Sequence, residues 1–223
     1  MSPLNITSSG VSLPRSQPPA LSANFLSRKH LFDLFESKAP GATLVIAPAG
    51  FGKTTLVAEW VKENERPTFW YTVDSTDSIQ DFQAHVIAAI TVHFPNFFAN
   101  VDQLEHYEPS EAIQLLSAAV GKLSGEFNFV IDGGREENPE ISTYGQLIAD
   151  TVPDNVHLVI IRRNSPMTSL ARYAALGNLS VITSADLKFS EDEVKSIASI
   201  NGVDLSENGN AKELAMCEGW PSA

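Results

Sequence analysis

The most informative segment of the chain reads Ala47-Pro48-Ala49-Gly50-Phe51-Gly52-Lys53-Thr54-Thr55. It follows an apolar run predicted to be a strand and opens a segment with the apolar spacing of a helix. In that context Gly50 and Gly52 let the backbone turn its amide groups toward a phosphate, and the helix adds the positive end of its dipole. We expect Lys53 to reach the β and γ phosphates and the Thr54 hydroxyl to ligate Mg2+. The segment therefore predicts a Walker A loop for ATP or ADP, although Ala47 stands where the motif usually has Gly.

A second acidic element ends the apolar run at residues 127–132. Asp132 has the place of a Walker B carboxylate, which holds Mg2+ directly or through water. A strand that simply ends in a turn Asp has the same local pattern, but the phosphate loop favours the metal role. Hydrolytic enzymes of this kind commonly carry a second acid at the next position, which is Gly133 here. Glu136 and Glu137 lie close enough to substitute by loop folding, so weak ATPase activity stays open while nucleotide binding is predicted.

Short apolar runs alternate with helical patterns over most of the chain, as in a parallel sheet covered on both faces. We predict an α/β fold, a doubly wound parallel P-loop sheet of about five strands followed by a small helical subdomain. The domains expected are a flexible leader at 1–21, a nucleotide-binding domain at 22–188 and the start of a helical subdomain, apparently cut short, at 189–223. The expected strands are 43–46, 68–73, 127–131, 157–161 and 179–182, and the expected helices are 27–36, 54–61, 79–93, 110–123 and 141–151. Ser190 and Glu193 have the spacing of a capping box that opens a further helix.

Composition narrows the classes of partner. The 223 residues carry a formal net charge of -12, which disfavours direct nucleic-acid binding by this segment. No apolar run approaches the length of a membrane helix, and the N-terminal residues lack the features of a secretory signal, so a cytoplasmic protein without membrane contact is expected. The single cysteine, Cys217, excludes an internal disulfide, and the five histidines show no metal-binding spacing.

Two arginines, Arg162 and Arg163, end the fourth predicted strand, where a guanidinium is suited to contacting a γ phosphate. Taken from the residues alone, they are also compatible with surface arginines at a strand exit.

At full length the segment 47–60 resembles the signature of the large ATP-binding LuxR-type transcription regulators, the group of the maltose-operon activator, which are signal-transduction ATPases with numerous domains. The similarity continues in order through residues 69–74, the Asp132 strand, 163–166 with 170–172, 186–190 and 217–221. It implies that Arg163 is a sensor arginine, that Pro221 packs on the adenine, and that Arg28 lies near the nucleotide. It also implies that the partners are other domains of the same regulator, with nucleotide-dependent self-association as one outcome.

The family pattern is not complete, because Gly133 replaces the usual second acid and residues 173–177 lack the arginines that usually follow. The function expected from the resemblance is a regulatory ATP/ADP switch with slow or no hydrolysis, in which Lys53, Asp132 and Arg163 act on the phosphates. Two alternatives stay open. One is a P-loop small-molecule kinase or nucleotidase, and the other is a scaffold with a degenerate site.

Overall fold

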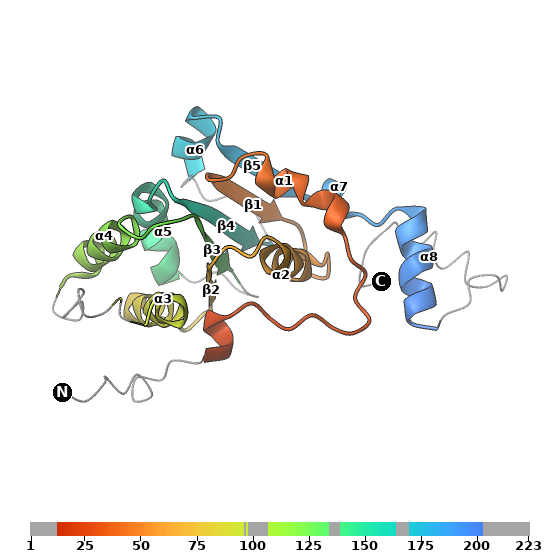
Figure 1. Cartoon of the computed structure of the whole chain (residues 1–223), viewed down its shortest axis with the longest axis horizontal. Helices are drawn as coiled ribbons and strands as arrows, with labels where there is room; N and C mark the ends of the chain where they lie inside the picture. Colours follow the sequence, from red (N-terminus) through yellow and green to blue (C-terminus); the bar gives the residue numbers. More distant parts are fainter. Residues whose placement is uncertain (1–12, 96, 98–106, 134–138, 164–169, 203–223) are drawn as a thin grey trace.

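The computed structural model describes residues 13–95, 97, 107–133, 139–163 and 170–202. Five parallel strands form one sheet in the order β2-β3-β4-β1-β5 (Figure 1). The strands are β1 (Ala42–Ile46), β2 (Thr68–Thr72), β3 (Phe127–Asp132), β4 (Val156–Arg162) and β5 (Leu179–Thr183). The predicted five-stranded parallel sheet is confirmed, with strand ends that differ from the predictions by one residue at most.

Helices cover both faces of the sheet. They are α1 (Asp33–Glu36), α2 (Lys53–Glu63), α3 (Ile79–His93), α4 (Pro109–Val120), α5 (Pro139–Thr151), α6 (Ala171–Ala175), α7 (Ser184–Leu187) and α8 (Glu191–Ile200), with 3-10 turns η2 (Leu13–Ser16) and η3 (Lys29–Leu31). None of the helices in the described ranges combines the length and apolar composition that a membrane crossing needs.

Strands β1 to β4 are apolar on both sides because each side faces a separate core, whereas Val181 of the edge strand β5 is 48% exposed. In β4, Leu158 and Ile160 pack with α3, α4 and α5, whereas Val159 and Ile161 pack with α2, α1 and α7. All four side chains are buried, the largest exposed fraction being 8% at Ile160. This is the two-sided burial that continuous apolar runs indicate in parallel sheets.

The helix predicted at 27–36 is broken into η3 and the short α1. Arg28 has a backbone conformation outside the helical region, with φ -125° and ψ 44°. Its backbone N–H donates to Glu59 of α2, and its guanidinium contacts residues between α7 and α8. Tertiary contacts therefore override the helical apolar spacing of this segment.

The segments near the two ends of the described chain can be compared with the leader and the helical subdomain expected from the sequence. Within the leader expected at 1–21, residues 13–16 form η2, and Arg15 is bonded to β2, so this part is held and not loose. At the other end α8 opens with the predicted capping box of Ser190 and Glu193. The rest of the expected helical subdomain, from residue 203 on, lies outside the described residues.

Candidate functional site

The loop between β1 and α2 has the backbone geometry that its two glycines predict. Gly50 and Gly52 have φ values of 81° and 71°, in the left-handed region that L side chains rarely adopt. Gly52 is the N-cap of α2, which has no side-chain cap. The amide groups of the first helical turn therefore lack the usual side-chain acceptor, and an anion would supply it.

The two predicted magnesium ligands lie together. The Thr54 hydroxyl donates to Oδ2 of Asp132 over 2.9 Å, although the residues are 78 positions apart in the chain. Thr54 lies in the first turn of α2, and Asp132 is the last residue of β3 with 8% of its surface exposed. A hydroxyl and a carboxylate at one point are the hard oxygen ligands that Mg2+ prefers, so these residues fit that ion.

The Lys53 side chain folds back on its own loop. Its ammonium donates to the carbonyl oxygens of Ala47 and Pro48, each over 2.7 Å, and the residue is only 8% exposed. Burial lowers the pKa of Lys53, the positive charge of Arg163 lowers it further, and Asp132 opposes both. A phosphate group would relieve the repulsion between the two cations. The cluster is therefore suited to an anion.

Strand order brings the arginines to the same place. Because β4 lies between β1 and β3, its carboxyl end lies between the phosphate loop and Asp132. Arg162 and Arg163 are half-buried there and line a cleft. The cleft is lined by Ala49, Gly50, Gly52, Lys53, Thr54, Thr55, Asp132, Ile161, Arg162 and Arg163.

A second cavity shares Gly50, Gly52 and Thr55 with the cleft and is more apolar. Its remaining lining residues are Leu26, Arg28, Phe51, Leu56, Glu59, Phe189 and Ile197. An apolar cavity that adjoins a phosphate cleft has the character needed by a purine ring. Sequence reasoning missed Leu26, Phe189 and Ile197, although Phe189 lies within the 186–190 block that carries part of the resemblance.

Arg28 lies at this cavity, as the resemblance implies, but its guanidinium is engaged elsewhere. It forms an ion pair with Glu193 over 2.7 Å, donates to the carbonyl oxygens of Leu187 and Lys188, and stacks on Phe189. The residue is 6% exposed. In this arrangement Arg28 shapes the cavity wall by joining the segment before α1 to the start of α8.

The backbone leaves no room for a side chain at Gly133. Its N–H donates to the Ile161 carbonyl oxygen over 2.9 Å, and an added Cβ would lie 2.9 Å from that same oxygen. A second Walker B acid would therefore require β3 or β4 to shift. Glu136, Glu137 and Pro221 lie outside the described residues, and so do most of the residues of the 163–166 block.

Comparisons with known proteins agree with this geometry. No family model matches the chain. The chain is 27% identical over 186 residues to the HTH-type transcriptional regulator MalT of Klebsiella pneumoniae, which covers 81% of the chain and 20% of that protein. It is 25% identical over 215 residues to MalT of Yersinia pestis, covering 93% of the chain and 24% of the relative. The chain thus spans a fifth to a quarter of the length of these relatives.

Solved structures show the fold. A signal-transduction ATPase with numerous domains and a tetratricopeptide repeat sensor, from Pyrococcus horikoshii, matches with a TM-score of 0.66 at 15% identity, over 96% of the chain and 30% of that protein. A Walker-type ATPase of Pyrococcus abyssi matches with a TM-score of 0.55 at 14% identity, over 92% of the chain and 67% of that protein. The chain is thus homologous to part of the MalT-type regulators and has the P-loop fold of the signal-transduction ATPases with numerous domains.

Proposed function

We propose that the chain is the nucleotide-binding switch domain of a MalT-like transcription regulator, and that it holds ATP or ADP with Mg2+ across the cleft and the second cavity. The observation that carries the proposal is the convergence of Lys53, Arg163 and the Thr54–Asp132 pair on one cleft beside the loop 47–52. The phosphates would lie on the loop amides and Lys53, and Mg2+ would be held by Thr54 and Asp132. Mg2+ would supply positive charge that neutralises the phosphates.

The second cavity is the reason to propose a switch and not a plain binding site. Phe189 lies just before α8 and Ile197 lies within it, and both follow the last strand of the sheet. A base in this cavity would contact both the phosphate loop and α8. In such a switch α8 would take up two positions relative to the sheet. A nucleotide that binds more tightly to the protein with α8 in one position would increase the population of that state. Arg163 would distinguish ATP from ADP, a role supported by its positive charge near Lys53 in the same cleft.

Slow or absent hydrolysis forms part of the proposal. The attacking water in hydrolytic P-loop sites is oriented by a carboxylate, and the position next to Asp132 has no space for one. The proposal also includes the division of the chain into a nucleotide-binding domain at residues 22–188 and the start of a helical subdomain at 189–223. The partners are the nucleotide and other domains of the same regulator. Direct nucleic-acid binding by this segment is disfavoured by the net charge of -12.

The test is a calorimetric titration of the chain with Mg-ADP and Mg-ATP, preceded by mass analysis of any nucleotide that copurifies. We expect Lys53→Ala to weaken binding at least tenfold, because it removes the ammonium from the phosphates, the equivalent of about 1.4 kcal/mol. Lys62→Ala is the matched control, since Lys62 is an exposed lysine on the same helix and should bind like the wild type.

A second variant examines the metal. Thr54→Val keeps the shape of the side chain but removes the hydroxyl that contacts Asp132. It should abolish the gain in affinity that Mg2+ gives the wild type. Wild-type protein that binds neither nucleotide, or a Lys53→Ala variant that binds as tightly as Lys62→Ala, would overturn the proposal. Fast multiple-turnover phosphate release would overturn the switch mechanism while leaving nucleotide binding intact.

A further inference from the structure

The segment from η2 to Arg28, residues 13–28, connects the edge of the sheet to the second cavity. In Figure 1 it leaves η2 beside β2, runs past α2 and reaches η3 and α1. We call residues 13–28 the strap. It belongs to no helix or strand between Gln17 and Arg28, yet polar contacts hold it at both ends.

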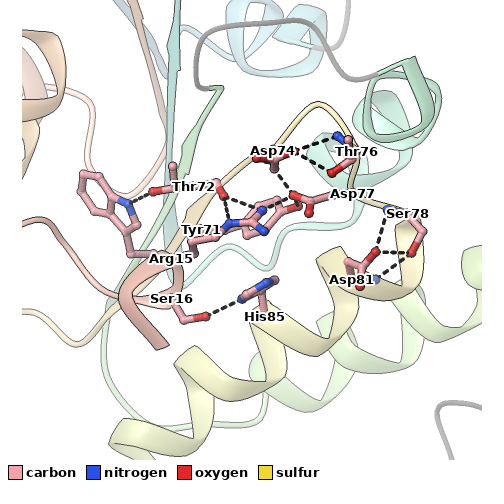
Figure 2. A network of polar contacts seen from close by, with 11 residues as sticks. Arg15, Ser16, Tyr71, Thr72, Asp74, Thr76, Asp77, Ser78, Asp81 and His85 are labelled. Carbon is pink, nitrogen blue, oxygen red and sulfur yellow. Dashed lines mark hydrogen bonds and ion pairs between the residues drawn. The ribbon is translucent and has the colours of Figure 1, made fainter. Parts of the chain in front are cut away.

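The first anchor is Arg15 of η2, whose side chain contacts the edge strand β2 (Figure 2). Its Nε and Nη2 donate to the Thr72 carbonyl oxygen over 3.0 and 2.9 Å, and Nη2 also forms an ion pair with Asp77. The guanidinium carbon lies 5.8 Å from the centre of the Tyr71 ring. Arg15 thus donates to a carbonyl group on the free edge of β2. In the middle of a sheet, a neighbouring strand would donate to such a group.

Asp77 links this anchor to the phosphate end of the sheet. Its Oδ2 accepts from the Tyr71 hydroxyl over 2.5 Å and from the Asp74 backbone N–H over 2.7 Å, besides Arg15. The loop that it holds begins at Val73, whose N–H donates to the Asp132 carbonyl oxygen over 2.9 Å. The Asp77 side chain is only 5% exposed, and these donors offset the free-energy cost of burying its carboxylate group.

A second contact of the same anchor comes from Ser16, whose hydroxyl lies 2.9 Å from Nδ1 of His85 on α3. Both residues are buried, with 3% of their surface exposed. The strap is therefore fixed to the β2 edge and to α3 by adjacent residues, as Figure 2 shows.

The other anchor lies at the second cavity. Glu59 of α2 is 3% exposed and accepts from the Ser27 hydroxyl and, over 3.0 Å, from the Arg28 backbone N–H. Leu26, the preceding strap residue, lines the cavity itself. The placement of Leu26 thus depends on a short tether that Ser27 and Arg28 fix to the P-loop helix.

We infer that Arg15 is a positioning residue of the nucleotide site, which acts through the strap and through the Asp77 loop and contacts no nucleotide. The inference rests on the proposed function. A strap fixed at Arg15 restricts the positions open to Leu26 before the base arrives, so less ordering accompanies binding. By linkage, a nucleotide that packs on Leu26 stabilises the docked strap by the same factor.

The test uses the full chain and two readouts, the Mg-ADP dissociation constant and the rate of tryptic cleavage after Arg28. Arg28 is 6% exposed and pairs with Glu193, so we expect trypsin to reach it only when this end of the strap detaches. We expect Arg15→Ala to weaken Mg-ADP binding about fivefold to tenfold, within the usual range of such couplings. It should also speed cleavage after Arg28 in nucleotide-free protein, and Mg-ADP should slow that cleavage in the wild type.

Arg172→Ala is the matched control. Arg172 also donates to a backbone carbonyl, pairs with an aspartate and lies over a tyrosine ring, through Asp150, Asp154 and Tyr173. It lies at α6, outside the strap, so its loss should change neither readout. Arg15→Lys keeps the ion pair with Asp77 and should restore part of the affinity.

Ser27→Ala gives an independent variant, because Ser27 is exposed and the substitution does not touch the Arg15 anchor. It should weaken Mg-ADP binding as well, and the double variant with Arg15→Ala should lose less than the product of the two factors. A folded Arg15→Ala protein with wild-type affinity for Mg-ADP would overturn the inference, whatever the affinity of the Ser27→Ala protein. A wild type that does not bind Mg-ADP would overturn the proposed function instead, and cleavage after Arg28 without nucleotide would still test the strap.

Discussion

Lowering the pH should destabilise the fold through His157, the second residue of β4. The side chain is 1% exposed, and its Nδ1 accepts from the Gly41 backbone N–H over 3.1 Å. That bond requires an unprotonated Nδ1, which leaves Nε2 to donate to the Thr43 hydroxyl over 3.0 Å. The pKa of His157 is lowered from 6.5 to about 4, chiefly by burial and in addition by the charge of Arg66, while Glu36 opposes the shift.

The sign follows from the unfolded chain, in which the imidazole is protonated below its ordinary pKa of 6.5. Between that value and about 4, the unfolded state binds a proton that the folded state excludes. The contribution of neutral His157 to the free energy of unfolding is therefore fully present above pH 6.5, and it is lost as the pH drops toward 4. A pKa difference of about 2.5, at about 1.4 kcal/mol for each unit, gives a loss of about 3 kcal/mol.

The assay is urea unfolding followed by far-ultraviolet circular dichroism at pH 7.5, 6 and 4.5. Tryptophan fluorescence is unsuitable, because the Trp60 ring lies 5.7 Å from the imidazole and would report its protonation directly. His157→Gln, whose amide does not titrate, should be less stable at pH 7.5 but lose about 2 to 3 kcal/mol less than the wild type on acidification. Parallel pH profiles for the two proteins would refute the assignment of a neutral, buried imidazole.

Three further changes test other parts of the structure. Gly133→Ala places a Cβ 2.9 Å from a backbone carbonyl oxygen of β4, so it should cost about 1 to 3 kcal/mol of stability, and a melting temperature equal to the wild type would contradict the close approach. Ser190→Ala removes the cap of α8, and thermal unfolding should show a loss of about 1 kcal/mol together with weaker Mg-ADP binding. Tyr71→Phe removes a donor to the buried Asp77 carboxylate and should cost about 1 to 3 kcal/mol in urea unfolding, whereas a neutral result would show that solvent or Arg15 replaces it.

Elements that depend on neighbouring residues could be predicted from the sequence. Strands β1 to β4 appear as apolar runs because both of their faces are buried, and the start of α8 appears because Ser190 and Glu193 bond each other three positions apart. The phosphate loop is local as well, since its glycines, lysine and threonine all lie within nine residues. Pairing Thr54 with Asp132 needed only the assumption that parallel strands end at one edge of the sheet.

Features that depend on distant residues could not be predicted. Arg15 lies in a stretch rich in Ser and Pro, and nothing nearby indicates that Asp77, 62 positions later, receives it. The apolar wall of the second cavity draws on Leu26, Phe189 and Ile197, whose local sequence patterns do not distinguish them from ordinary apolar positions. The helix expected at 27–36 failed for the same reason, because Glu59 and the α7–α8 segment determine the conformation of Arg28.

The two halves of the proposed nucleotide site are held in different ways. The phosphate half is formed by strand ends and a helix start, and the sheet fixes the positions of Thr54, Asp132 and Arg163 relative to one another. The base half is formed by the end of the strap, Phe189 and α8, and the strap and α8 are joined to each other by side-chain contacts such as that of Arg28 with Glu193. Breaking a few such contacts costs far less than displacing a strand from the middle of a sheet. A nucleotide that spans both halves would therefore leave the phosphate half in place and change the relative populations of the positions of α8. A switch requires this property, and a rigid hydrolytic site would lack it.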